Sequence, residues 1–160
     1  MQSYVYSTNQ NNQIQYHIKE WQKKPFVMGY IYFCLNDYRT QMGEEGYGKF
    51  QIRRHGITDA SLNLKTSYYV LKQLASPIEI TKVKQANDNE ALVELKVKGD
   101  IPCYILRGYS IEYKSSTNKI ITIKLPDLYP KNTYSFTLRD INPQFKFQVI
   151  KPGGYNVINY

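Results

Sequence analysis

The chain has 160 residues, 42% of them hydrophobic, and its 21 basic and 13 acidic residues give a net charge of +8. This composition suffices for one ordinary domain or two small ones and argues against disorder. Its lysines are scattered singly and form no basic run interleaved with aromatic residues, so we expect no nucleic-acid partner. No apolar run is long enough to span a bilayer and the N-terminus lacks a signal-peptide pattern, so we expect no membrane partner and no export signal.

The first predicted element is a helix over residues 13–23, preceded by a strand end or loop over residues 1–12. The helix could begin as early as Thr8 or Asn9. Its apolar positions recur at helical spacing, at Ile14, Ile18 and Trp21. Pro25 ends the helix because proline has no N–H to donate.

Residues 26–35 contain no charge and are rich in β-branched and aromatic types, which predicts a strand buried on both faces in a parallel sheet. A long loop follows, and residues 63–74 predict a second helix with Asn63 as its N-cap. One buried strand and two helices cannot cover both edges of that strand. Residues 1–75 are therefore predicted to be the last part of a larger parallel sheet or barrel, and the chain a piece of a longer one.

After Pro77 the pattern changes to short segments that alternate apolar and polar residues with turns between them. The predicted strands lie in residues 78–85, 91–99, 104–114, 119–126, 133–140 and 145–155. Six or seven short strands favour a β-sandwich of immunoglobulin or fibronectin type III kind over residues 77–160. The fold class expected for the whole chain is α+β.

The run GYIYFCLNDYRTQMGEEG, followed by RRHGITD and KTSYYVL, resembles the end of the catalytic barrel of glycoside hydrolase family 2. The final segment, ending in IKPGGYNV, is similar to the β-sandwich that follows the barrel in one branch of that family. The resemblance implies that residues 9–23, 26–35 and 64–75 correspond to helix seven, strand eight and helix eight of a (β/α)₈ barrel. The parent would be a retaining β-glycosidase, such as a β-galactosidase, acting on carbohydrate without a cofactor.

The resemblance also implies that one wall of the sugar cleft is formed by Phe33, Asp37, Tyr38 and Arg39. An internal ion pair that holds the loop is the alternative role for Asp37 and Arg39. Tyr38 and Tyr47 are candidates to stack on sugar rings, with packing as their alternative role. The family's two catalytic glutamates correspond to positions upstream of Met1, so no catalytic residue is expected here. Glu44 and Glu45 are adjacent carboxylates in the loop and are expected to be solvated or paired with Arg53 and Arg54.

Three positions differ from the family's usual pattern. Phe33 stands where a tryptophan usually forms the floor under the sugar, Leu62 where a glycine is common, and Thr66 where a proline favours helix entry. Neither His17 nor His55 has other ligands at metal-binding spacing, so no metal is expected. The phosphate-loop pattern is also missing around Gly43, Gly46 and Gly48.

The function expected from the resemblance is closure of the barrel in a parent enzyme, with no activity in isolation. A stand-alone β-sandwich module that binds protein or glycan is the alternative. Exposed barrel surface would favour self-association. Cys34 and Cys103 are expected to be buried free thiols. Localisation stays open, although the parent enzymes are expected to be periplasmic or secreted bacterial proteins.

Overall fold

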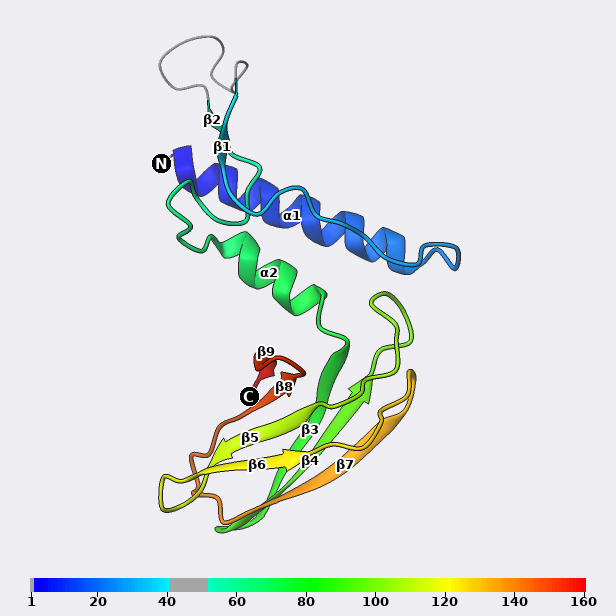
Figure 1. The fold of residues 1–160 in the computed structure, drawn as a ribbon, viewed down its shortest axis with the longest axis vertical. Coiled ribbons are helices and arrows are strands. Elements are labelled where there is room, and N and C mark those ends of the chain that lie inside the picture. Colours follow the sequence, from blue (N-terminus) through cyan, green and yellow to red (C-terminus); the bar gives the residue numbers. More distant parts are fainter. Residues whose placement is uncertain (1, 41–51) are drawn as a thin grey trace. The chain divides into compact units, whose positions relative to one another are not determined.

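A computed structural model describes residues 2–40 and 52–160, and its chain separates into two compact units, Met1–Leu74 and Ala75–Tyr160. The described residues are mostly β-sheet with two helices, and their sheets are antiparallel (Figure 1). Each unit has its own hydrophobic core. The described residues form no barrel.

Helix α1 (Gln2–Gln22) begins well before the predicted start, so the expected strand end or loop over residues 1–12 is wrong from residue 2 onward. No glycine or proline interrupts residues 2–22, and the helix therefore continues through them. Ile14 and Ile18 are buried, as the helical spacing predicts, whereas Trp21, the third predicted apolar position, is 37% exposed. Neither described helix is both long and apolar enough to cross a membrane.

The predicted strand over residues 26–35 is not a strand in the structure. The segment runs extended alongside α1 (Figure 1), but it belongs to no sheet. A strand needs a neighbour to complete its hydrogen-bond ladder, and within the described residues a neighbour exists only at its end. There the Leu35 carbonyl accepts from the Thr58 amide at 2.8 Å, and Asn36 forms a parallel bridge with Thr58.

Two short strands follow this segment, β1 (Tyr38–Arg39) and β2 (Ile52–Arg53), which pair with each other. Helix α2 (Thr66–Leu74) begins three residues later than expected. Asn63 does not cap it, because its side chain donates to the Asp59 carboxylate at 2.8 Å. The apolar side of α2 packs against the buried Ile14, Ile18 and Ile57 through Tyr68, Val70, Leu71 and Leu74.

The second unit contains seven strands in two antiparallel sheets. One sheet has the order β3-β4-β7, formed by β3 (Ile78–Asn87), β4 (Glu90–Val97) and β7 (Thr133–Arg139). The other has the order β6-β5-β8-β9, formed by β6 (Ile120–Lys124), β5 (Ser110–Lys114), β8 (Phe147–Lys151) and β9 (Tyr155–Asn159). The two sheets share one core, which makes the unit sandwich-like.

The alternating pattern predicts the inward residues of these strands correctly. Along β4 the apolar residues at every second position are fully buried: Ala91, Val93, Leu95 and Val97. Two details differ. The chain over 104–109 forms only a bridge, Leu106 with Leu128, and a turn with positive φ at Gly153 and Gly154 separates β9 from β8. Both cysteines are free as expected, but Cys34 is only half-buried and Cys103 is exposed.

Candidate functional site

Residues 26–35, named here the apolar segment, present two chemically similar faces to different surroundings. Tyr30 and Tyr32 face the helices and pack on the core around Ile14 and Ile18. On the other face, the exposed fractions are 96% for Ile31 and 73% for Phe33. Met28 is 95% exposed. A row of large apolar side chains in water is unusual for a surface that functions uncovered.

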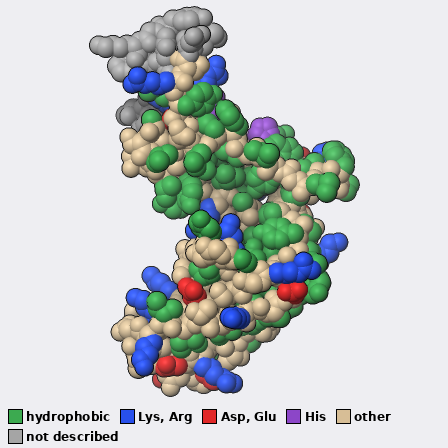
Figure 2. Space-filling view, in the orientation of Figure 1, with side chains coloured by type: hydrophobic (Ala, Val, Ile, Leu, Met, Phe, Trp, Pro, Cys, Tyr) green, Lys and Arg blue, Asp and Glu red, His purple; other side chains and the backbone are tan. Residues whose placement is uncertain are grey.

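The backbone of the apolar segment is also without partners over most of its length. Among the described residues, none forms a backbone hydrogen bond with residues 28–33. Extended backbone with free N–H and C=O groups is a template for pairing with another strand. Figure 2 shows hydrophobic side chains gathered on the visible face of the N-terminal unit. The segment thus combines apolar surface with open hydrogen-bonding edges.

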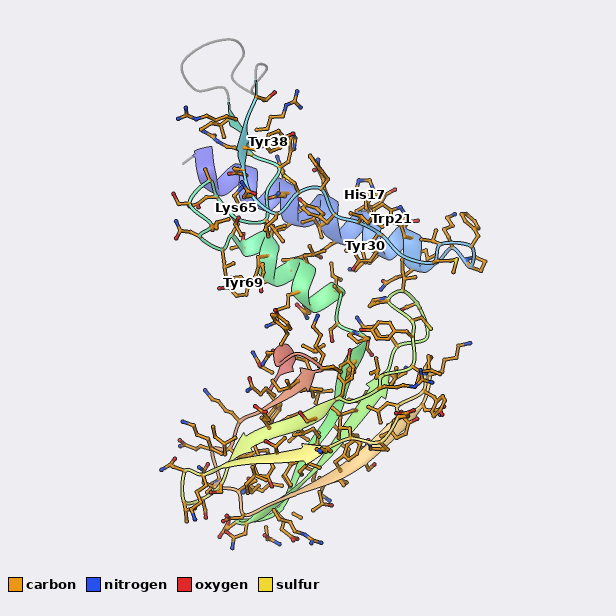
Figure 3. The ribbon with its side chains drawn as sticks, in the orientation of Figure 1. His17, Trp21, Tyr30, Tyr38, Lys65 and Tyr69 are labelled. Carbon is orange, nitrogen blue, oxygen red and sulfur yellow. The ribbon has the colours of Figure 1, made fainter. Side chains whose placement is uncertain are left out.

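Aromatic rings link the apolar segment to α1. His17 stacks on Trp21 with ring centroids 5.7 Å apart, and Trp21 lies 5.7 Å from Tyr30 (Figure 3). Burial raises the pKa of Tyr30, whose hydroxyl is buried and has no hydrogen-bond partner among the described residues. These rings border a small cavity of about 300 Å³ that Arg54 and His55 also line.

The C-terminal end of the apolar segment is held by a charged contact. The Asp37 carboxylate is buried and accepts from the Lys65 ammonium at 2.6 Å and from the Gly56 amide at 3.0 Å. The Lys65 ammonium also donates to the Gly56 carbonyl at 3.0 Å. This cluster fixes the loop after the segment against the start of α2.

The residues predicted to line a sugar cleft lie in different environments. The rings of Phe33 and Tyr38 meet edge to face with centroids 5.9 Å apart, and Arg39 is exposed. Asp37 instead forms the internal ion pair that was its alternative role. Glu44, Glu45, Tyr47 and the three loop glycines lie outside the described residues. The structure therefore brings Phe33 and Tyr38 together and directs the Asp37 carboxylate inward.

Sequence reasoning missed Lys65 and the ring stack of His17, Trp21 and Tyr30. Lys65 is 28 residues from Asp37, and no local pattern marks such a pair. The ring stack joins a helix to an extended segment, so only the fold reveals it. Within residues 2–40 and 52–160, no group of three His, Cys, Asp or Glu side chains could hold a metal ion.

No family model and no curated protein matches the chain. Among solved structures it is similar to the archaellum periplasmic stator protein FlaG from Sulfolobus acidocaldarius, at 11% identity and a TM-score of 0.38, covering 52% of this chain and 95% of that one. It is also similar to the sensor domain of the anti-sigma factor RsgI4 of Pseudobacteroides cellulosolvens, at 18% identity and a TM-score of 0.35, covering 52% and 90%. Such weak likeness says nothing about function, and the resemblance to glycoside hydrolase family 2 stays a prediction.

Proposed function

We propose that this chain is a non-catalytic interaction module that binds another polypeptide through the apolar segment. The proposal rests on one observation: Met28, Ile31 and Phe33 are exposed beside backbone groups that have no partner among the described residues. Burying such side chains contributes about 1.5–3 kcal/mol each. The matching partner is an extended strand with apolar side chains, because it would satisfy both the backbone edge and the apolar surface.

The test is the behaviour of the purified full chain in sedimentation velocity. Whether the segment docks a partner or is barrel surface left uncovered, the chain alone should self-associate in a concentration-dependent way. The double variant Met28→Glu/Ile31→Glu should sediment as a monomer, because two carboxylates would have to be buried in the contact. Ile120→Glu is the matched control, since Ile120 is 71% exposed on β6 in the other unit and should not alter association.

Hydrogen exchange of the same samples locates the contact. Amides of residues 28–33 should exchange rapidly in the monomeric double variant and slowly in the associated wild-type chain. A wild-type chain that stays monomeric at high concentration, with these amides already protected, would show that the segment is covered internally and would overturn the proposal.

In a second candidate function, the partner that covers the apolar segment is the rest of an enzyme barrel. We propose that the apolar segment is strand eight of a family 2 glycoside hydrolase barrel and that the chain completes a retaining β-glycosidase. The extended form of residues 26–35 between two helices supports this, as does the edge-to-face pair of Phe33 and Tyr38, which could meet a sugar ring at the cleft wall. The division of seven strands into sheets of three and four is in keeping with an immunoglobulin-like or fibronectin type III-like sandwich.

This candidate predicts that the isolated chain does not turn over aryl β-galactosides or β-glucuronides, because both catalytic glutamates would belong to other strands. Turnover by the purified chain above that of an identically purified blank would refute it. The positive test is the coding sequence upstream of Met1. An in-frame extension with a strand-ending glutamate shortly before Gln2 would identify the parent, and an in-frame stop there would argue for the module alone.

A further inference from the structure

The small cavity of about 300 Å³ in the N-terminal unit has a lining that suits one class of ligand. Its volume is at the lower end of the range of small-molecule sites. One wall is a face of α1, and another is formed by residues 30–33 of the apolar segment. Arg54 and His55, which follow β2, complete the lining. All of these residues belong to the unit Met1–Leu74, so the cavity lies within one unit.

Hydrogen bonds hold the walls of the cavity together. The Gln10 side-chain amide on α1 donates to the Tyr32 hydroxyl at 2.9 Å and to the His55 carbonyl at 2.9 Å. The Tyr32 hydroxyl in turn donates to the same carbonyl at 3.0 Å. These bonds join α1 to the apolar segment and to the chain after β2. The cavity is therefore formed before any ligand arrives, which lowers the entropic cost of binding.

One end of the cavity is aromatic. The stacked rings of His17 and Trp21 and the ring of Tyr30 form a row in which neighbouring centroids are 5.7 Å apart (Figure 3). This spacing leaves no room for another ring between them, so a ligand ring would lie against the row. Ile14 and Ile18, which are buried, add apolar surface to the lining. This end suits a flat apolar group.

Polar groups line the cavity toward the start of α1. Gln10 meets the chain after β2 there, whereas Tyr30 meets Trp21 near the end of the helix. Gln13 lies between these two ends, one turn or about 6 Å along the helix axis from the ring of His17. A single ring with a short polar tail spans such a distance.

The charges in the lining favour an anionic tail. Arg54 lines the cavity and has a formal positive charge, and no Asp or Glu is present among the described residues that line it. The amide of Gln13 adds an N–H donor. A carboxylate can accept from both kinds of donor, and its bonds to a guanidinium are among the stronger hydrogen bonds in proteins. An ammonium group would face Arg54 without a compensating carboxylate.

We propose that this cavity binds a small aromatic carboxylic acid, with its ring against His17 and Trp21 and its carboxylate toward Gln13 and the positive charge of Arg54. Binding involves no chemical step. The proposal does not depend on docking through the apolar segment, because both walls of the cavity belong to one chain. Met28 does not line the cavity, so Met28→Glu should impair docking and leave the affinity for the acid unchanged.

The experiment titrates the full wild-type chain with three probes that share a phenyl ring and differ in the charge of a short tail: phenylacetate, 2-phenylethanol and phenethylamine. Trp21 is the chain's one tryptophan and lines the cavity, so its fluorescence reports binding. We expect saturable binding of phenylacetate, roughly tenfold weaker binding of the alcohol, and the weakest binding of the amine. No saturable response to phenylacetate, or equal binding of the three probes, would overturn the proposal.

Variants then locate the contacts, each beside a control of the same residue type. Gln13→Ala and Arg54→Gln should each weaken the binding of phenylacetate by roughly fivefold or more. Gln15→Ala and Arg53→Gln should not, because neither residue lines the cavity. Arg54→Gln should leave the binding of 2-phenylethanol unchanged, since the alcohol has no charge, whereas a general loosening of the cavity would weaken both probes. Equal losses in the variant and the control of each pair would contradict this site.

Discussion

The Lys65 ammonium lies 2.6 Å from the Asp37 carboxylate. Because Lys65 directly precedes α2, this ion pair joins the chain just after the apolar segment to the start of that helix. The Asp37 side chain is 9% exposed and the Lys65 side chain 22%. Each therefore loses most of its hydration and depends on the other for compensation. The contact joins two parts of the N-terminal unit that are 28 residues apart in the sequence.

Replacing Lys65 by methionine should destabilise the N-terminal unit by about 2 kcal/mol, because Asp37 would remain buried without its partner. Trp21 is the chain's one tryptophan, so its fluorescence during urea unfolding reports on this unit alone. The matched control is Lys23→Met, whose pair with Glu20 is solvent-exposed and should be without measurable effect. Equal midpoints for wild type and Lys65→Met would show that the pair contributes nothing.

Gly56 is required where two stretches of backbone approach closely. A Cβ atom at this position would lie 2.3 Å from the backbone of Asn36 and Asp37, and neither can move without breaking the contacts to Thr58. Gly56→Ala should therefore cost about 3 kcal/mol or more by the same fluorescence measurement. Gly29→Ala is the control, since a Cβ there meets nothing within 4 Å. A wild-type midpoint for Gly56→Ala would contradict the packing described.

Leu62 adopts a left-handed backbone conformation with φ of 65°. Its side chain is exposed, so the residue gains little packing in return for this strain. Leu62→Gly should stabilise the N-terminal unit by about 1 kcal/mol, because glycine adopts this conformation freely. Leu64→Gly, at a similarly exposed position without positive φ, should not stabilise it. An increase in both variants would mean that the effect is not due to strain at Leu62.

Tyr113 links the two sheets of the sandwich. Its hydroxyl donates to the Arg139 carbonyl at 2.8 Å and accepts from the Arg139 amide at 3.2 Å, joining β5 to β7. Tyr113→Phe should lower the stability of the sandwich by about 1–2 kcal/mol, measured by circular dichroism in urea. Tyr129→Phe, at a half-exposed ring, serves as the comparison. If both substitutions have the same small effect, the cross-sheet bonds do not stabilise the unit.

Tyr109 makes the sandwich sensitive to alkaline pH. Burial, together with the hydrogen bond to Tyr104, raises the pKa of Tyr109 above its ordinary value of about 10. The phenol thus ionises more readily in the unfolded chain. The stability associated with its neutral form is fully present below about pH 10 and is lost as pH rises above that value. Tyr109→Phe should show a shallower fall in stability between about pH 10 and 11 than the wild type, and parallel curves would contradict this account.

The strands of the second unit could be predicted because their alternating pattern encodes which side chains face the core, and no distant residue is needed to recognise it. The structure of the apolar segment could not be predicted in the same way. Ten uncharged residues favour a strand, but a strand forms only where neighbouring strands exist, and the sequence of the segment does not show whether they do. The Asp37–Lys65 pair depends on a contact between residues 28 positions apart in sequence. Of the predicted cleft residues, Phe33 and Tyr38 contact each other, whereas Asp37 forms an internal ion pair with Lys65.

Alternate residues of the apolar segment face different surroundings, the core of the N-terminal unit on one side and water on the other. Tyr30 and Tyr32 contribute to the stability of this chain, since they pack on its own helices. Ile31 and Phe33 contribute nothing comparable while they face water, and the proposed docking would give them a role. If the covering polypeptide is lost, the outward positions should drift toward polar residues while the inward ones persist. Sequences of homologues would therefore test the proposed docking at Ile31 and Phe33 without any binding measurement.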